Sequence, residues 1–586
     1  MSTAHVPRQQ HHANAPAPPA PPALPEPPPV PPYASEATRL LCAGTYQDAE
    51  YRDRVIEQLY LNEQRIVAPS SGFDAARVLA HALRARRQEL LWSAAVLGLW
   101  AVGLAVGGLL LGLPLLAGLL LALAPRLRGS AEQPPLYRLF AAFVVRWYGR
   151  LLFAAGLALM VAAAFGAGSD GGSGSGSSYD SYDSYDPWYG SASGGSGGSG
   201  SFDGTPLEST EPWQAWFGIA VLVLIALCAA ARHDRFARVF AAELSAKRFP
   251  DLANDPAEQA EGERFSRLVR RIRREQHAPL VMYDEARPFC GAGTAYDTWV
   301  LAVELRPDED AAPQPLSNRA ILERIRPLLE QLRTPAEYAG TAVRDRLRRL
   351  EIDECVFLPV EGLTDRDQAP YSAEEFERHR VRAVEEGGEK RRHFLRIRVG
   401  GWDEELVVTV FVRVHTQGRM LMLEVAPHVL NPVRAEFKEG DRVSHRLLHG
   451  NVVGRAAGAL ALAPGSAGRS LAALTHGAVF AWRLLTGGHA VALPDGPALS
   501  VRELAAVDVG STFQRMDVDR YLRSIQDRIG RGVRQALADA GYETGEFVQK
   551  IVNISNGAVH IDRVEGSTFA IGEHASASGG AAPQKG

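Results

Sequence analysis

The sequence predicts an α-helical membrane anchor of about four spans plus a cytoplasmic α+β domain, with a C-terminal helix and a short β-tail. Three observations lead to this fold class. The N-terminal half contains long uncharged apolar runs, arginines flank these runs, and the second half mixes strand-like and helix-like apolar patterns. The 586 residues carry a net charge of −4. The chain therefore lacks the overall positive charge that would indicate a nucleic-acid partner.

The composition changes sharply along the chain, which divides it into segments of different character. In chain order we expect a disordered Pro-rich tail (1–35), a cytoplasmic helical segment (36–90), a helical membrane hairpin (91–124), a cytoplasmic connector (125–150), a transmembrane helix (151–168), a disordered Gly/Ser/Asp external loop (169–211), a second transmembrane helix (213–231), a cytoplasmic α+β domain (233–510), an amphipathic helix (511–545), a β-tail (546–572) and a disordered end (573–586).

The first apolar run, Leu91–Ala124, holds 34 residues without a charge. As one helix it would be roughly 50 Å long, against a hydrocarbon core of about 30 Å. Two short spans that turn at Gly107-Gly108 or near Pro114 fit better, and a single tilted helix kinked at Pro114 is the alternative. Arginines lie on both sides of the run, at 84, 86, 87, 126 and 128. This pattern predicts that both ends of the hairpin are cytoplasmic.

Two further apolar runs complete the predicted anchor. The span at 151–168 should run outward, because arginines precede it, and residues 169–211 contain seven acidic residues and no Lys or Arg. The span at 213–231 starts with Trp213 and Trp216 and is followed by Arg232, so it should return to the cytoplasm. We therefore expect a multi-pass protein of the plasma membrane with both termini in the cytoplasm and the lipid bilayer as a partner.

The second half of the chain shows the alternation of a mixed α+β domain. We expect strands at 280–283, 298–305, 355–360, 393–399, 405–415 and 419–427, with a hairpin turn at 416–418. We expect helices at 318–332, 335–350 and 372–386. The Ala/Leu/Gly-rich stretch 452–485 is interrupted by arginines, which favours buried or interfacial helices over spans.

A basic amphipathic helix is predicted just after the last span. Its arginines form a candidate contact with anionic lipid, at Arg264, Arg267, Arg270, Arg271 and Arg274. The alternative is the solvated face of a helix that packs on the domain.

The predicted C-terminal helix carries a coiled-coil-like stripe, which is a candidate face for a homo-oligomer. The residues are Val518, Leu522, Ile525 and Ile529, at spacings of four, three and four. Beyond this helix, Asn556-Gly557 lies between two apolar runs, as in a type I′ hairpin. A strand-rich tail with unpaired edges would strengthen self-association.

Motifs that would indicate catalysis or a cofactor are weak. The turn Cys290–Thr294 contains two glycines and follows a predicted strand, but no Lys-Ser/Thr pair follows it as phosphate binding would need. The four cysteines form no C-x-x-C pair, which favours reduced thiols over a disulfide framework or zinc site. The sequence thus predicts no catalytic residue, no cofactor and no metal.

Several short stretches resemble large, uncharacterised multi-pass membrane proteins of actinobacteria. They are Leu40-Leu41-Cys42-Ala43, Gly72-Phe73-Asp74, His81–Arg87, Pro288–Gly293, Asn556–His560 and Phe569–Gly572. The resemblance implies a membrane topology and carries no mechanism.

These patterns favour a non-enzymatic membrane protein whose cytoplasmic domain acts as a scaffold, a sensor or a binding site for an unidentified cytoplasmic protein. The alternative is a membrane-anchored enzyme with an unrecognised site in residues 280–430, which would need several polar side chains in one deep pocket.

Overall fold

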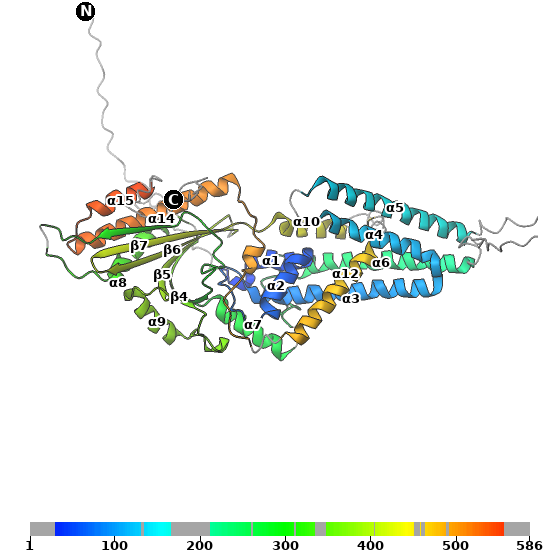
Figure 1. Ribbon diagram of the computed structural model, residues 1–586, viewed down its shortest axis with the longest axis horizontal. Helices are drawn as coiled ribbons and strands as arrows, with labels where there is room; N and C mark the ends of the chain where they lie inside the picture. Colours follow the sequence, from blue (N-terminus) through cyan, green and yellow to red (C-terminus); the bar gives the residue numbers. More distant parts are fainter. Residues whose placement is uncertain are drawn as a thin grey trace, which may run out of the picture.

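The computed structural model describes residues 30–129, 134–165, 211–259, 262–309, 312–333, 347, 349–402, 405–449, 458, 463–487 and 492–555. Long helices occupy one end of the elongated molecule, and a sheet with its covering helices occupies the other (Figure 1). The expected external loop, the Asn556-Gly557 hairpin, the disordered end, and most of the Pro-rich tail and of the expected helix at 335–350 lie outside the described residues.

A compact helical cluster joins the two ends. It contains η1 (Pro32–Ala34), α1 (Glu36–Gln47), α2 (Ala49–Ile56) and the π-helical turn η2 (Glu57–Leu61). Ser35 and Asp48 cap α1 and α2, because their side-chain oxygens accept backbone N–H groups of the first turns. Leu41, Ile56 and Val78 are buried together with Phe437 from the second half of the chain. The segment expected at 36–90 is therefore helical, and it packs against residues from far along the chain.

The bundle contains α3 (Ala75–Gly107), η3 (Gly108–Leu111), α4 (Gly112–Arg128), α5 (Leu136–Ala164) and α6 (Pro212–Ala242). The hairpin turn falls at Gly108, whose φ of +56° suits a residue without a Cβ. Within the described residues, three helices are long and apolar enough to cross a membrane, α3, α5 and α6. The chain therefore has three candidate apolar spans, and α4, with 17 residues, is a shorter apolar helix beside α5.

Two boundaries in the bundle differ from the sequence-based expectation. The expected connector 125–150 is largely helical, because α5 begins at Leu136 and continues without a break into the apolar run. The aromatic and aliphatic residues between Arg138 and Arg150 keep the apolar spacing of a helix. The arginines among them do not break the helix, because their long side chains can carry the charge away from its apolar surface. In the same way α3 begins at Ala75, capped by Asp74, and joins the helix that precedes the first apolar run to that run without a break.

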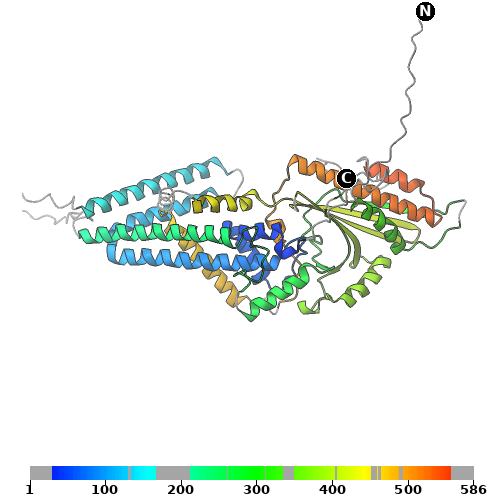
Figure 2. The same cartoon turned by 180° about the vertical axis from the view of Figure 1, so that it is seen from behind.

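Two helices from the second half of the chain pack on the bundle. They are α10 (Ala435–His449), beside α6, and α12 (Ser466–Thr486), beside α3 and α4. Figure 2, the opposite view, shows the same placement. The contact of α12 with α4 is close, since a Cβ on Gly468 of α12 would meet the Ala122 Cβ of α4 at 2.2 Å. The described part of the Ala/Leu/Gly-rich stretch from Ser466 onward thus forms a helix packed against the bundle.

The domain is built on a seven-stranded, half-barrel-like sheet. Its strands are β1 (Leu280–Tyr283), β2 (Thr294–Ala295), β3 (Trp299–Glu304), β4 (Leu350–Pro359), β5 (Arg392–Gly401), β6 (Leu406–Gln417) and β7 (Met420–Leu430). The order is β1-β4-β5-β6-β7-β2, with β3 also paired to β7. Only the β1–β4 pair is parallel. The hairpin predicted at 416–418 is present, with Gln417 opposite Met420.

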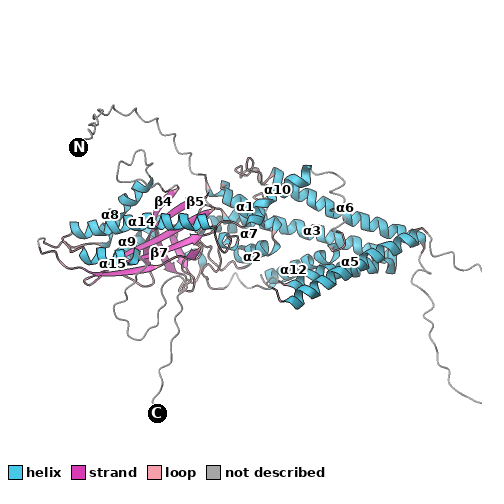
Figure 3. Ribbon diagram, turned by 90° about the horizontal axis from the view of Figure 1, so that it is seen from above, coloured by secondary structure: helices cyan, strands magenta, loops and turns pink. Residues whose placement is uncertain are grey.

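Helices cover one face of the sheet: α8 (Asn318–Glu330), α9 (Ala373–Glu385), α14 (Thr512–Asp539) and α15 (Gly545–Ser555). Figure 3 shows α14 lying along the strands. Alternate residues of β5 and β6, such as Ile397 and Val410, meet α8 and α14 in the main core. The remaining elements are α7 (Glu263–Gln276), α13 (Val501–Leu504), η4 (Gln331–Arg333) and η5 (Arg366–Gln368).

The C-terminal segment corrects one expectation. Residues 551–555, expected as the first strand of the β-tail, form the last turns of α15. Phe547 is buried in the main core and Ile551, four residues later, packs against the same core. This spacing places both residues on one face of a helix, so helical packing overrides the strand propensity of the short apolar run.

Candidate functional site

The glycine-rich turn after β1 binds an anion, and the anion belongs to the chain itself. The backbone N–H groups of Gly291 and Gly293 donate to the same carboxylate oxygen of Glu503, at 2.7 and 3.0 Å. Both glycines have φ near +98°, as a nest of N–H groups requires. Burial, and then the nearby Glu503 carboxylate, raise the pKa of the Cys290 thiol to about 12. The turn therefore holds α13 in place, and its cysteine is a protonated, unreactive thiol.

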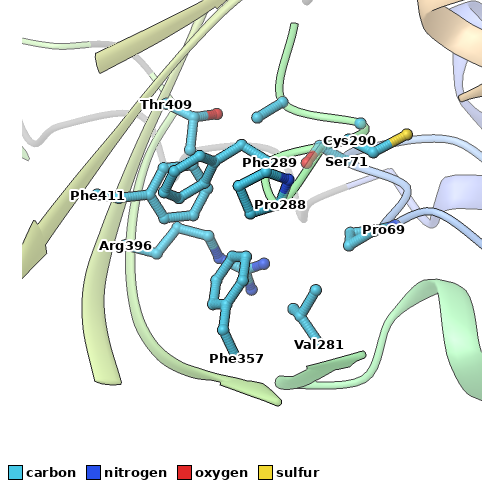
Figure 4. Close-up of a pocket in the computed structure, with 12 residues that line it drawn as sticks. Pro69, Ser71, Val281, Pro288, Phe289, Cys290, Phe357, Arg396, Thr409 and Phe411 are labelled. Atoms are coloured by element: carbon cyan, nitrogen blue, oxygen red, sulfur yellow. The ribbon is translucent and has the colours of Figure 1, made fainter. Parts of the chain in front are cut away.

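A small pocket lies beside this turn, on the sheet face opposite α14. Figure 4 shows Phe289 next to Phe411, with Phe357 below them and the Cys290 sulfur directed away from the rings. The pocket measures about 20 Å³, which is room for about one water molecule. Its one charged side chain, Arg396, donates to both oxygens of Asp353. This pocket, inside the range of the enzyme hypothesis, has neither the volume nor the convergent acids and bases that a substrate site needs.

A buried ionic cluster fastens the segment after α6 to α3. Arg77 donates to Asp255 Oδ2 from Nε and Nη2, at 2.9 and 2.7 Å, and His81 Nε2 lies 3.1 Å from the same oxygen. Burial raises the pKa of Asp255, but the hydrogen bonds from His81 and Arg77 outweigh burial and hold that pKa below its ordinary value. Tyr46 Oη lies 3.2 Å from His81 Nδ1. The charges are mutually compensated, which is the arrangement of a structural cluster.

A cavity of about 530 Å³ opens next to Tyr46, where the bundle meets the helical cluster. We call it the junction cavity. Its walls come from α1, α3, α6, α10 and α12, and its side chains include Trp92, Val96, Cys228, Arg232, His233, Phe236, Glu436, Glu439 and Arg469. Burial, and then the neighbouring charge of Arg232, lower the pKa of Arg469. In the sequence, Arg232 indicated only the topology of the last apolar run. The sequence did mark Arg469 as unusual, because a charged residue that interrupts an apolar stretch often belongs to a functional site.

The basic helix α7 is packed on its apolar side and paired on much of its charged side. Leu268, Val269 and Ile272 are buried. Arg264 pairs with Glu63 at 2.6 Å, and Arg271 and Arg274 pair with Asp367 at 3.0 and 3.8 Å. Among the described residues, Arg267 and Arg270 have no ion-pair partner. Arg264, Arg267 and Arg271 line a second cavity of about 380 Å³ together with Arg483.

The predicted oligomer face is occupied within the chain. Val518, Leu522, Ile525 and Ile529 are only 0–4% exposed and pack on the sheet and α8. Their spacing therefore describes how α14 packs on its own domain, and in the folded chain these four side chains are not available to a second copy.

An exposed apolar patch lies at the beginning of α14, outside this core. Val509, Phe513 and Met516 are 61–71% exposed. Trp402, at the β5–β6 turn, is also exposed, and its indole N–H donates to Asp517 at 3.0 Å. This bond places the indole beside the same helical turn. We call these four residues the α14 patch. No regular pattern in the sequence marks it, because Trp402 comes from a distant turn.

In the part of the chain that the structure describes, no group of three or more His, Cys, Asp and Glu side chains is placed to hold a metal ion.

Residues 298–569 match the model of the AbeC-like domain family. The matched range begins at β3 and also includes α10 and α12, so it reaches from the sheet to the helices that line the junction cavity. No curated protein and no solved structure matches the chain. The resemblance to actinobacterial multi-pass proteins stays a prediction.

Proposed function

We propose that this chain is a four-span protein of the plasma membrane whose AbeC-like domain binds a cytoplasmic protein and acts as a scaffold or sensor. The spans are α3, α4, α5 and α6, and both termini are cytoplasmic. The arginines that flank the apolar runs support this orientation. The hairpin geometry of α3 and α4, with its turn at Gly108, also supports it.

The α14 patch is the observation that carries partner binding. Exposing Phe513 and Met516 to water has a hydrophobic cost of about 1.5–3 kcal/mol per side chain relative to burial. A partner with an apolar surface of similar size would recover it, and aromatic and Met side chains are enriched where proteins bind one another. Lipid is a less suitable occupant, because the charged side chains of Asp517 and Arg520 lie beside the patch.

The orientation is tested by topology reporters placed at residues 80, 130, 190 and 260. We expect an external signal at 190 alone. An external signal at 80 or 130 would contradict the four-span arrangement.

Partner binding is tested by a photo-crosslinking residue in place of Phe513 in the full-length protein in cells. We expect one discrete protein adduct, which disappears in the Met516→Glu background because a charge in the patch opposes apolar burial. The matched control is the crosslinker at Val381, an exposed apolar position on α9. An adduct with a second copy of the chain would reassign the patch to self-association, and equal labelling at both positions would remove the proposal.

A further inference from the structure

The lining of the junction cavity changes in a fixed order along the membrane normal. Cys228 and Arg232 lie one helical turn apart on α6, where the apolar run ends. Trp92 and Val96 on α3 occupy the apolar side of this boundary. The deep end of the cavity is therefore apolar, and its first charges appear where the proposed span leaves the hydrocarbon.

The acidic end of the cavity lies further from the bilayer. On α10, Glu436 and Glu439 both precede Gly440 within about one helical turn, and a Cβ on Gly440 would meet the Phe240 ring at 2.3 Å. Phe240 is two helical turns beyond Arg232 on α6, about 12 Å along the helix axis. From the bilayer outward, the lining is thus apolar, then basic, then acidic.

The cavity is lined by both positive and negative side chains, so it can attract ligand groups of either charge. Arg232 and Arg469 line the same cavity, and burial followed by the charge of Arg232 lowers the pKa of Arg469. Arg232 also pairs with Glu89 on α3 at 3.5 Å. Neither Glu436 nor Glu439 has an ion-pair partner within the described residues. His233, which also lines the cavity, has its Nδ1 2.9 Å from the Ala229 carbonyl oxygen. A ligand that carries one negative and one positive group would neutralise this site from both ends.

We propose that the junction cavity binds the phosphoethanolamine headgroup of a phospholipid from the cytoplasmic leaflet. The phosphate lies between Arg232 and Arg469, and the primary ammonium donates to Glu436 and Glu439. The acyl chains leave past Trp92 and Val96 into the bilayer. The headgroup order of such a lipid, with the ammonium outermost, the phosphate next and the chains innermost, matches the order of the lining.

The volume of the cavity agrees with this occupant. A cavity of about 530 Å³ is within the usual range for small-molecule sites, about 300–1,000 Å³. Guanidinium groups suit phosphate because their N–H groups match its oxygens in pairs. The trimethylammonium of phosphatidylcholine offers no N–H donor, so the two carboxylates would discriminate against it. This site goes beyond partner binding. It rests on the proposed spans for the position of the bilayer and on the proposed orientation for the choice of leaflet.

The test is lipid binding to full-length, delipidated protein in detergent, measured by native mass spectrometry. Phosphatidylethanolamine, phosphatidylcholine and phosphatidylglycerol with identical acyl chains are titrated separately. We expect wild type to prefer phosphatidylethanolamine over the other two by about tenfold, the equivalent of one charge-assisted hydrogen bond. We expect Arg469→Gln to weaken all three lipids by about tenfold, and the double variant Glu436→Gln/Glu439→Gln to abolish the preference.

Matched variants separate the site from general effects. Arg442→Gln removes an exposed arginine of α10 and should bind like wild type, and Arg469→Lys should bind better than Arg469→Gln. Soluble sn-glycero-3-phosphoethanolamine should compete at least about tenfold more weakly than the lipid, because it lacks the apolar contacts. Equal binding of the three lipids by wild type, or unchanged binding by Arg469→Gln, would overturn the proposal. Full competition by the soluble compound would overturn the lipid assignment. None of these outcomes depends on the topology reporters.

Discussion

Helices α14 and α5 have many apolar residues each, but they use them in opposite ways. The stripe Val518–Ile529 of α14 is buried against the sheet, and the rest of that helix is rich in charge. On α5, Tyr137, Phe140 and Phe143 are 58–70% exposed, and few residues of the helix are buried by the rest of the chain. An amphipathic helix places its apolar side on a core. The part of α5 at 151–164 has no charged residue on any side, which fits a lipid environment. The comparison teaches that the polar residues of a helix, more than its apolar ones, indicate which solvent it faces.

The largest expected effect is on the buried side of this comparison. Ile525→Ala should destabilise the protein by about 2–5 kcal/mol, because Ile525 is fully buried and its truncation leaves a cavity that the surrounding side chains fill only in part. The measurement is denaturant or thermal unfolding of the full-length protein in detergent. Met516→Ala, on the exposed side of the same helix, should change stability by less than about 0.5 kcal/mol. An equal loss of stability in the two variants would show that the buried and exposed sides of α14 do not differ as proposed.

A smaller loss is expected where α14 and α8 approach most closely. A Cβ on Gly532 would meet the Ile325 Cα at 2.8 Å, so Gly532→Ala should cost about 1–3 kcal/mol by overpacking. Gly545→Ala is the control, because nothing lies within 4 Å of its Cβ position. A stabilised Gly532→Ala protein would show that the two helices can separate freely.

The sheet domain should also show a pH dependence. The hydrogen bond from His393, together with that from Arg380, outweighs burial and lowers the pKa of Glu354 to about 2. A carboxylate with a depressed pKa contributes stability above its unfolded pKa of about 4.5, and this contribution is lost as the pH falls through about 2.

We therefore expect Glu354→Gln to cost about 1–2 kcal/mol at pH 7, with the difference from wild type shrinking from pH 5 downward. Thermal unfolding at several pH values measures it. Glu374→Gln, at an exposed position on α9, should give no such pH-dependent difference. A gap between wild type and Glu354→Gln that stays constant down to pH 2 would contradict the assignment.

The smallest effect is expected on α5. Phe140→Ala should change stability in detergent by less than about 0.5 kcal/mol, because the ring packs on little of the protein. A photoreactive side chain at this position should instead form adducts with lipid in membranes. Loss of folding in Phe140→Ala would show that this face of α5 packs on protein.

The sequence predicted much of the local structure. The strand at Leu280–Tyr283 agrees residue for residue, the β6–β7 hairpin turns where expected, and the Gly107-Gly108 turn ends α3. These features depend on short-range patterns, namely alternation, glycine at positive φ and charge at span ends. The long-range arrangements could not be predicted in this way. They include the parallel β1–β4 pair and the intramolecular burial of the α14 stripe.

The candidate site was predicted less well, for the same reason. The junction cavity combines five helices that are up to about 400 residues apart in the chain, and only packing brings Tyr46 near Arg469. The anion-binding character of the Cys290 turn was visible in its glycines, whereas its occupant, Glu503, was not. Pairing of the α7 arginines with distant acids was hidden as well.

The continuity of α3 has a mechanical consequence. Its 33 residues form a rod of about 50 Å that starts beside α1 and α2 and ends at the far side of the bundle. A rod of that length that tilts by about 10° displaces one end by about 9 Å relative to the other. Changes in bilayer thickness alter helix tilt. Because Arg77 and His81 near its first turns are fastened to Asp255, such a tilt moves the segment that leads into the sheet domain.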